Sequence, residues 1–381
     1  MPSLFDPLTI GKMRVSNRIG VSPMSMYSSL DGHPSDFESF HYGSLSIGGA
    51  SLIFTGTSAI APNGRISPSD PGLWSDEHID SHKKIITAIQ VGEGTPAVQI
   101  GHAGRKASTT VPWLGGPPKA EGRSLMSEEG AWQTVAPSAL PFGGDKTHLP
   151  AELDDAEIED IIAAFGNAAD RAARAGYELL EIHGGHGYLM QQFLSPIANK
   201  RTDGWGGSLE NRMRFAREVI RSVRKCWPSE KPISLRMPVE DFHDGGLMVS
   251  DGVNIAKMAQ EEGVDMIDLN SFGGIAVGGQ VPWGTPFTRG HARAIKEALP
   301  ELLIAGSAQT APDFNTSPQE LTAVVDSGDF DFVLLGRQLL ADPHWPVKAA
   351  VVLGDDRLQR PRQYEHWLTG RGGRDRQVAN P

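Results

Sequence analysis

The chain has 381 residues, of which 39 % are hydrophobic and 21 % charged, proportions that are typical of a soluble globular enzyme. Its formal net charge of −11 argues against nucleic acid or an anionic membrane surface as a partner, because both would repel it. The sequence has neither the start of a signal peptide nor an apolar run approaching about 18 residues, so it predicts a cytoplasmic protein without a membrane span.

Short apolar runs recur along the chain, with helical patterns between most of them. Most of these runs are continuous rather than alternating, which is typical of parallel strands that are buried on both faces. The expected strands cover residues 18–22, 51–57, 96–100, 177–182, 232–236, 266–269, 302–305 and 330–335. Alternation of strand and helix repeated eight times predicts an α/β protein with a single (β/α)₈ TIM barrel, and a doubly wound sheet is the alternative.

Three of the intervening helices have readable boundaries. A helix is expected to begin at the acidic residues that follow Asp154 and to end at Gly176. A second helix has Ser208 as its predicted N-cap, and its apolar residues recur at steps of three or four. A third helix is expected to follow Asp251 and to end near Gly263.

Residues 101–153, after the third expected strand, interrupt the alternation of strands and helices. The segment is rich in Gly, Pro, Trp and Ser and has no clear helical pattern. Long irregular insertions in compact domains are usually functional, and this one follows the C-terminal end of a strand, where barrel active sites are built. We therefore expect a lid or a binding loop, with a surface embellishment as the alternative.

The segment from His183 to Tyr188 places two imidazoles and a phenol directly after the fourth predicted strand. Glycines at 184, 185 and 187 allow a tight turn, so that His183, His186 and Tyr188 can converge. Imidazoles can donate hydrogen bonds to an oxygen that gains negative charge, and a phenol can supply a proton. We interpret the segment as a polar active site. The alternatives are structural histidines or a zinc pair, which lacks a third ligand at suitable spacing.

Polar residues and glycines also follow the other predicted strands. The last two strand ends carry glycines and an arginine, which is the usual barrel phosphate site, so a phosphorylated cofactor or substrate is expected over the mouth. The residues at these ends are Ser22, Pro23, Met24, Ser25, Met26, Tyr27, Thr57, Gln99, Arg236, Gly306, Ser307, Gly336 and Arg337.

Several of these motifs together resemble the Old Yellow Enzyme family of FMN-dependent ene reductases. The matching segments are residues 17–24, 102–106, 183–189, 193–196, 199–212 and 336–337, and the resemblance runs from about Leu4 to Trp367. Within the family the chain is most similar to the bacterial xenobiotic-reductase and thermophilic-like branch, through residues 74–76, 282–284 and 363–367.

This resemblance implies that FMN lies on the C-terminal mouth of the barrel and that NADPH or NADH reduces it. It also implies a homodimer or higher homo-oligomer. The flavin ring is expected to contact Ser22, Pro23, Met24, Ser25, Thr57, Gln99 and Arg236, and its phosphate Gly306, Ser307, Gly336 and Arg337.

The implied reaction is reduction of the activated C=C bond of α,β-unsaturated carbonyl or nitro compounds. His183 and His186 are expected to bind the substrate oxygen while hydride passes from N5 of FMN to Cβ, and Tyr188 is expected to protonate Cα. Tyr27 and Trp367 are implied to line the substrate pocket, with Trp367 reaching it from a neighbouring subunit. Residues 1–367 then form the FMN-binding barrel, and residues 368–381 are predicted to be a disordered tail.

The sequence departs from this branch at Ser25, where relatives usually carry a cysteine that is thought to tune the flavin potential. A hydroxyl can still donate a hydrogen bond to the flavin edge, so activity is expected to survive while the potential differs.

Of three other functions, the residues alone exclude one and leave two open. A dienoyl reductase of the same barrel type needs an iron–sulfur cluster, which the single Cys226 cannot ligate. A flavin-independent lyase or aldolase would need a metal set or a Schiff-base lysine, for which Lys106 is the candidate. A flavin-binding sensor without catalytic activity is the third alternative.

Overall fold

The structure is a computed structural model that describes residues 3–115, 124–143, 148–270, 274–276, 280–282, 287–306, 317–358, 361 and 363–364. None of the helices in these ranges is both long and apolar enough to cross a membrane. Trp367 and the tail from 368 to 381 lie outside the described residues, and so does Ser307.

Eight parallel strands form a closed barrel, because β4 pairs with β3 on one side and with β6 on the other. The strands are β3 (Ile19–Val21), β4 (Leu52–Phe54), β6 (Thr95–Gly101), β9 (Leu179–His183), β10 (Ile233–Pro238), β11 (Met266–Asn270), β12 (Leu303–Gly306) and β13 (Phe332–Leu335). Each one overlaps a strand expected from the sequence, so the predicted (β/α)₈ barrel is confirmed.

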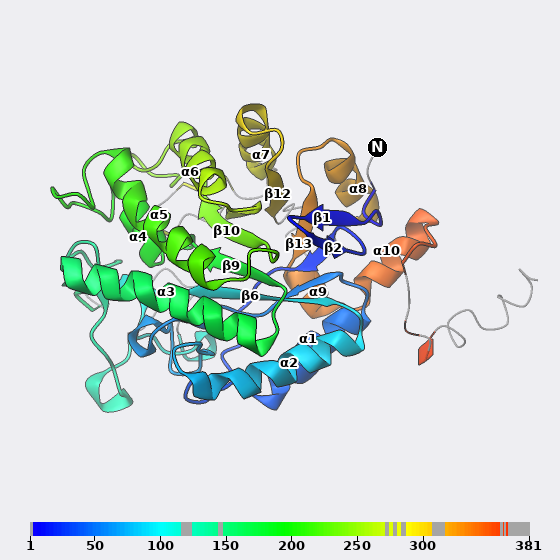
Figure 1. Cartoon of the computed structure of the whole chain (residues 1–381), viewed down its shortest axis with the longest axis horizontal. Helices are drawn as coiled ribbons and strands as arrows, with labels where there is room; N and C mark the ends of the chain where they lie inside the picture. The colour runs from blue at the N-terminus through cyan, green and yellow to red at the C-terminus, as the bar shows by residue number, and fades with distance from the viewer. Residues whose placement is uncertain are drawn as a thin grey trace, which may run out of the picture.

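Helices surround this barrel on the outside (Figure 1). They are α1 (Asp36–Ile47), α2 (Ile79–Val91), α3 (Asp155–Ala175), α4 (Leu189–Leu194), α5 (Leu209–Cys226), α6 (Val249–Glu261), α7 (Phe287–Ala298), α8 (Pro318–Asp326), α9 (Arg337–Ala341) and α10 (Trp345–Leu353). The apolar faces of these helices and the outward-facing strand residues form the larger of the core clusters.

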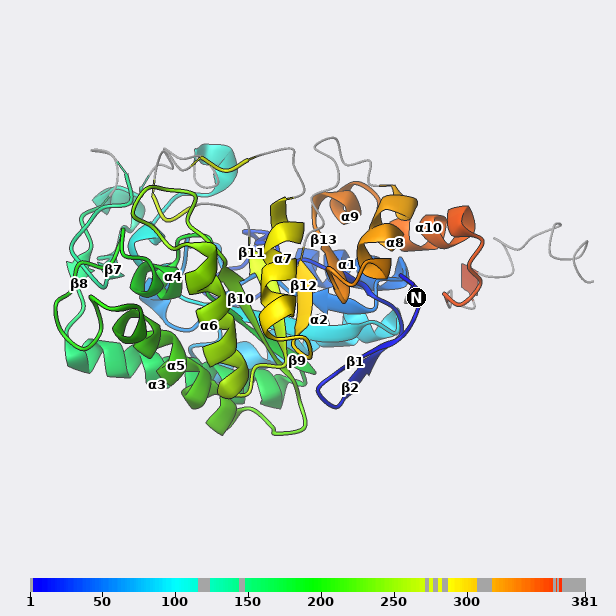
Figure 2. The ribbon, with the colours of Figure 1, turned by 90° about the horizontal axis from the view of Figure 1, so that it is seen from above.

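An antiparallel hairpin of β1 (Leu8–Ile10) and β2 (Met13–Val15), absent from the sequence prediction, closes one end of the barrel. Its residues Leu8, Ile10 and Val15 are buried in one cluster with inward-facing strand residues such as Leu179 and Met266. In Figure 2 the hairpin lies on the side of the barrel opposite to α9, which follows the C-terminal end of β13. The other end of the barrel is therefore the mouth.

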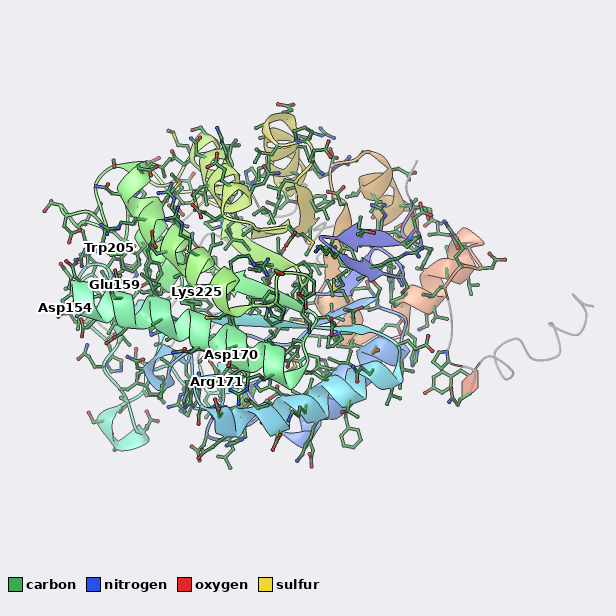
Figure 3. All side chains as sticks on the ribbon, in the orientation of Figure 1. Asp154, Glu159, Asp170, Arg171, Trp205 and Lys225 are labelled. Atoms are coloured by element: carbon green, nitrogen blue, oxygen red, sulfur yellow. The ribbon has the colours of Figure 1, made fainter. Side chains whose placement is uncertain are left out.

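The helix boundaries follow capping chemistry. Asp154 accepts a hydrogen bond from the Glu157 amide at 2.8 Å, and Gly176 ends α3 with a φ of +107°, as the sequence predicts. The labels in Figure 3 mark Asp154, Glu159 and Asp170 along the polar outer face of this helix. Ser208 caps α5 as predicted, through a 3.2 Å hydrogen bond from the Asn211 amide.

The predicted start of α6 is wrong by a few residues. This helix begins at Val249 rather than after Asp251, and it ends near Gly263 as expected. The Asp251 carboxylate accepts a hydrogen bond from the Met248 amide at 3.0 Å, so it caps the helix from within the first turn.

The insertion after β6 is irregular in its described parts. Between residues 101 and 153 the structure has the single turns η3 (Gly104–Lys106), η4 (Pro112–Leu114) and η5 (Ser127–Glu129) and the short pair β7 (Val135–Ala136) and β8 (Ala151–Glu152), but no α-helix among the described residues. β5 (Ser58–Ala59) and the turns η1 (Pro62–Gly64) and η2 (Asp76–His78) lie between β4 and α2. The role of the insertion as a lid remains a prediction.

Candidate active site

The turn after β9 is tightly constrained by its glycines. The Gly184 amide donates to the Arg236 carbonyl at 2.6 Å, and His186 has a φ of +55°, which is uncommon for a residue with a side chain. A side chain at Gly187, whose φ is +72°, would overlap the carbonyl oxygen of Gly274. Backbone strain and close approach therefore fix the direction in which His186 and Tyr188 point.

We expect Gly187→Ala to destabilise the protein by more than ~1 kcal/mol and to displace the two flanking side chains, because it combines an unfavourable φ with a steric overlap. Gly130→Ala is the matched control, since Gly130 also has a positive φ but nothing within 4 Å of a new methyl group. Thermal unfolding of both variants measures the difference. Equal losses in the two variants would show that the approach to Gly274 does not matter.

His183 and His186 contact each other directly. The Gly185 amide donates to Nδ1 of His183 at 3.2 Å, which places the proton of a neutral His183 on Nε2. This Nε2 lies 3.0 Å from Nδ1 of His186, so His183 is the donor of that hydrogen bond and His186 is protonated on its own Nε2. Among the described residues, no group of three or more His, Cys, Asp or Glu side chains could hold a metal ion.

Burial sets the protonation of the whole cluster. It lowers the pKa of His183 and of His186 well below the usual histidine value, and the nearby Arg236 lowers both further. Burial also raises the pKa of Tyr188 well above its usual value. At neutral pH the site therefore holds two neutral imidazoles and a protonated phenol, as the predicted chemistry requires.

The two predicted tyrosines share one surface. The ring of Tyr188 lies 5.0 Å from that of His183 and 6.2 Å from that of His186, measured between centroids. Tyr27 and Tyr188 both pack against the small cluster of Ile66, Ala103 and Ala107. The structure thus brings the predicted acid and a predicted substrate-binding residue together with the histidine pair.

Gln99 and Thr57 lie side by side at the next strand ends. The Thr57 hydroxyl donates to Oε1 of Gln99, and Nε2 of Gln99 donates to Oε1 of Glu181 at 2.8 Å. A methyl group at Gly101 would touch both Thr57 and His183 at 3.0 Å, so these side chains border the same space.

Arg236 is buried between the strand ends and forms an ion pair with Asp268, with Nε 3.2 Å from Oδ2. Its Nε has no hydrogen bond of good geometry, and its Nη1 reaches the Ser22 hydroxyl only at 3.5 Å. A guanidinium with this spare donor capacity fits the pyrimidine end of a flavin, which needs donors and gains negative charge when reduced. The residues present therefore fit FMN.

The first and last strand ends meet at Met24. A Cβ added at Gly336 would lie 3.3 Å from Sδ of Met24 and 3.9 Å from Cβ of Ser22. A Cβ added at Gly56 would lie 2.7 Å from the Met24 carbonyl oxygen and 3.1 Å from Cα of Ser25. Gly306 ends β12 as predicted, and Arg337 begins α9 in an exposed position.

Two neighbouring cations, the buried Arg105 and the half-buried Lys106, anchor the insertion to the site. The sequence placed both in a family motif and gave Lys106 only as the candidate lysine of a lyase or aldolase. Lys106 donates to the His186 carbonyl at 2.7 Å and to the Gly274 carbonyl at 3.3 Å. Arg105 donates to the carbonyls of Leu140, at 3.2 Å, and Ile275. Adjacent cations in an otherwise apolar stretch were the available signal. Burial lowers the pKa of Lys106 to about 7.

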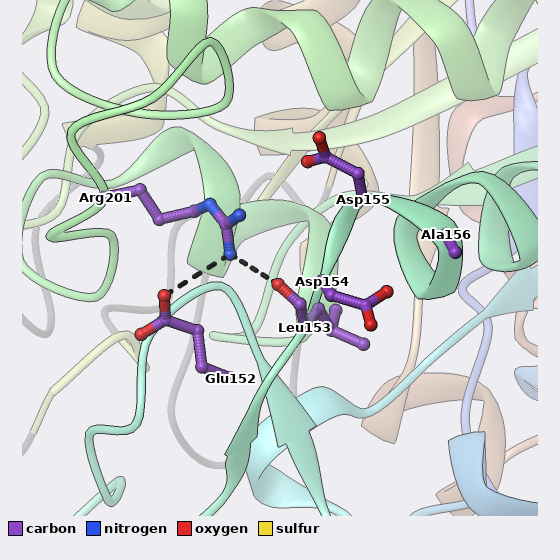
Figure 4. A pocket seen from close by; sticks show the side chains of 6 residues that line it. All are labelled: Glu152, Leu153, Asp154, Asp155, Ala156 and Arg201. Carbon is purple, nitrogen blue, oxygen red and sulfur yellow. Dashed lines mark hydrogen bonds and ion pairs between the residues drawn. The ribbon is translucent and has the colours of Figure 1, made fainter.

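A surface hollow of about 620 Å³ lies at the start of α3 and is lined by none of the predicted site residues. Figure 4 shows Arg201 in this hollow, donating to the Leu153 carbonyl at 2.6 Å and lying 3.6 Å from Oε1 of Glu152. Arg201 also pairs with Asp203 at 2.6 Å. Its charge is already satisfied, so we assign it to holding the end of the insertion in place.

Residues 3–356 match the model of the NADH:flavin oxidoreductase / NADH oxidase family. The chain belongs to this family. It is 38 % identical over 363 residues to an NADPH dehydrogenase of Bacillus cytotoxicus, covering 95 % of each chain. It superposes on morphinone reductase in complex with tetrahydroNAD with a TM-score of 0.75 at 26 % identity, over 95 % of this chain and 93 % of the other.

A third match extends the likeness in fold. The old yellow enzyme homologue of Zymomonas mobilis gives a TM-score of 0.73 at 23 % identity, over 94 % of both chains. The resemblance to the Old Yellow Enzyme family is confirmed. The protein is an FMN-dependent oxidoreductase that takes its electrons from NAD(P)H.

Proposed function

We propose that this oxidoreductase reduces the activated C=C bond of α,β-unsaturated carbonyl or nitro compounds. One observation carries the proposal: two neutral, mutually hydrogen-bonded histidines and a protonated tyrosine lie together at the barrel mouth, in a space that Thr57 also borders. This set can bind an oxygen and deliver a proton.

The histidine pair would bind the carbonyl or nitro oxygen of the substrate. Both rings are neutral and each carries one N–H. In this structure the N–H of His183 is donated to His186, and it would turn to the substrate oxygen when the substrate binds beside His186. Burial makes such hydrogen bonds stronger than they are in water. Donation to this oxygen withdraws electron density from the conjugated alkene and activates its β-carbon.

Tyr188 would then supply the proton to Cα. Its phenol stays protonated because burial raises its pKa, and proton transfer becomes favourable once the adjacent carbon has gained negative charge. Tyr27, beside it on the same small cluster, would form the wall of the substrate pocket. Trp367 remains a predicted second wall.

Bound FMN would supply the redox chemistry, by accepting a hydride from NAD(P)H and passing it to the β-carbon. Gln99 and Arg236 would hold its pyrimidine side, where Arg236 would stabilise negative charge, and Thr57 would lie near its O4/N5 edge. The backbone of Pro23 and Met24 would lie under the ring, with Ser25 at its edge. The loops at Gly306 and Gly336 would hold its phosphate.

A colour test examines this function directly. Purified protein should be yellow, should bleach with NADPH in the absence of oxygen, and should recolour when 2-cyclohexenone is added. A sensor without catalytic activity would bind FMN and stay bleached. Protein that is reoxidised by oxygen but not by enones or nitroalkenes would contradict the proposed substrate class.

A further inference from the structure

Two carboxyl groups and one arginine lie buried inside the barrel close to His183, which is the register partner of Arg236. Glu181 and Asp268 are 0 % and 1 % exposed, and Arg236 is 5 % exposed. The strand register sets this arrangement, because Glu181 lies beside Gln99 and Ser234, and Arg236 lies beside Asp268. The single positive charge of Arg236 can therefore neutralise only one of the two carboxyl groups.

The two carboxyl groups differ in their distance from the cation. Asp268 forms the ion pair with Arg236, at 3.2 Å. Glu181 contacts only neutral groups in its hydrogen bonds, Gln99 Nε2 at 2.8 Å and the Ser234 hydroxyl at 2.9 Å. A second buried anion without its own cation is costly, so Glu181 is the neutral acid. Burial, and to a lesser extent the charge of the neighbouring Asp268, raises the pKa of Glu181 to about 8.

Glu181 also orients a residue of the proposed flavin site. Because Nε2 of Gln99 donates to Glu181, the carbonyl end of this carboxamide points toward Thr57 and the barrel mouth. An amide oxygen in this direction accepts a hydrogen bond from an N–H group, such as the one in the flavin pyrimidine ring.

We propose that Glu181 is a positioning residue for FMN: it orients Gln99 and, at alkaline pH where its carboxyl is ionised in the oxidised enzyme, it takes up a proton when the bound cofactor gains negative charge on reduction. The inference rests on the proposed placement of FMN against Gln99 and Arg236. The groups that face the carboxyl are Gln99 from β6, Ser234 and Arg236 from β10, and Asp268 from β11, and of these Arg236 and Asp268 carry charge.

The proton balance separates this role from a purely structural one. Hydride from NAD(P)H brings two electrons and one proton to the oxidised cofactor. Where Glu181 is ionised in the oxidised enzyme, its carboxylate binds a second proton from solvent and becomes the neutral acid. Two protons then accompany two electrons. Below the pKa of Glu181 the group is already protonated, and one proton accompanies the two electrons.

The midpoint potential of the bound FMN, titrated anaerobically against reference dyes from pH ~6 to ~10, measures this stoichiometry. For the wild-type enzyme we expect the slope of potential against pH to double above pH about 8. Glu181→Gln should keep the shallower slope throughout, because its carboxamide reproduces the hydrogen bonds of the neutral acid but cannot titrate. A doubled slope that persists in this variant would overturn the proposal.

Glu38→Gln is the matched control. Burial also raises the pKa of the Glu38 carboxyl, which accepts hydrogen bonds from Ser28 at 3.0 Å and Ser29 at 2.8 Å instead of from the flavin site. This variant should keep the doubled slope. Loss of the doubling in Glu38→Gln would assign the second proton to a general effect of buried carboxyl groups and would overturn the proposal.

Ser234→Ala tests the proposal with Glu181 intact. The hydrogen bond from Ser234 favours the ionised carboxylate, so its removal should raise the pKa of Glu181 and move the change of slope to higher pH. An unmoved change of slope would contradict the proposal. So would a folded Glu181→Gln protein that has lost FMN. Wild-type protein without FMN would instead contradict the proposed cofactor site itself.

Discussion

Replacing Tyr188 with phenylalanine is expected to slow the alkene half-reaction by about a hundredfold or more, while FMN stays bound and is still reduced by NADPH. The change removes the hydroxyl that burial keeps protonated and leaves the ring beside His183 in place. Stopped-flow measurement of the two half-reactions separates reduction by NADPH from reoxidation by the enone.

Tyr177→Phe is the control for this variant. Tyr177 is also fully buried, and its hydroxyl is 2.8 Å from Nδ1 of His82 on α2, so its phenol contacts a surrounding helix instead of the histidine pair. It should lose some stability, about 1 kcal/mol for one hydrogen bond, and keep both rates. Wild-type reoxidation in Tyr188→Phe would remove Tyr188 from the mechanism.

Replacing both His183 and His186 with alanine should abolish the long-wavelength charge-transfer band that a bound phenolate gives with oxidised FMN. The phenolate of 4-hydroxybenzaldehyde needs donors at the position of the substrate oxygen. The neutral pair would supply them once the N–H of His183 turns from His186 to the phenolate. FMN content should persist, because the proposed flavin contacts come from other strands. Absorption spectra recorded during titration with the phenol provide the measurement.

Two further variants show whether the loss of the band is specific to the pair of His183 and His186. His33 and His78 form another neighbouring ring pair, 4.8 Å apart between centroids, and their double change to alanine should leave the band intact. His186→Asn should restore part of the band, since a carboxamide also donates an N–H. If the band survives the loss of His183 and His186, the oxygen is bound elsewhere.

The barrel itself could be predicted because its strands are short and largely apolar, and because glycines and capping residues mark the helix ends. Asp154, Gly176 and Ser208 act as their positions suggested. The β1–β2 hairpin was missed although Leu8, Ile10, Met13 and Val15 alternate around a glycine, since the eight longer runs already accounted for a complete barrel. Alternation over three residues on each side is too short to predict a strand alone.

The convergence of His183, His186 and Tyr188 could be predicted, since one glycine-rich turn carries all three. The arrangement of Glu181 and Asp268 around Arg236 could not be predicted. Glu181 and Asp268 lie within runs that look uniformly buried, and only the pairing of β9 with β10 and of β10 with β11 places both carboxyl groups around Arg236. Register between strands is a property of the closed barrel, not of any one segment.

The contacts that anchor the insertion could not be predicted either, because they too depend on how distant segments meet in the folded chain. The partners of Arg105 and Lys106 are backbone carbonyls far along the chain, and a carbonyl leaves no signal in the sequence. Such contacts can be identified only after the chain has folded. They connect the insertion to the turn that carries the histidines, which is the position a lid would need.

In the proposed reaction, cofactor and protein deliver two different hydrogens to one alkene, and isotopic labelling tests this directly. Turnover of a cyclic enone with NAD(P)H that carries deuterium as the transferred hydride should place deuterium only on Cβ of the product. Turnover in D₂O with unlabelled NAD(P)H should place it on Cα. Mass spectrometry and NMR of the product read both positions. Deuterium on Cα from the nucleotide, or the absence of deuterium on Cα after turnover in D₂O, would contradict the assignment of hydride to FMN and proton to Tyr188.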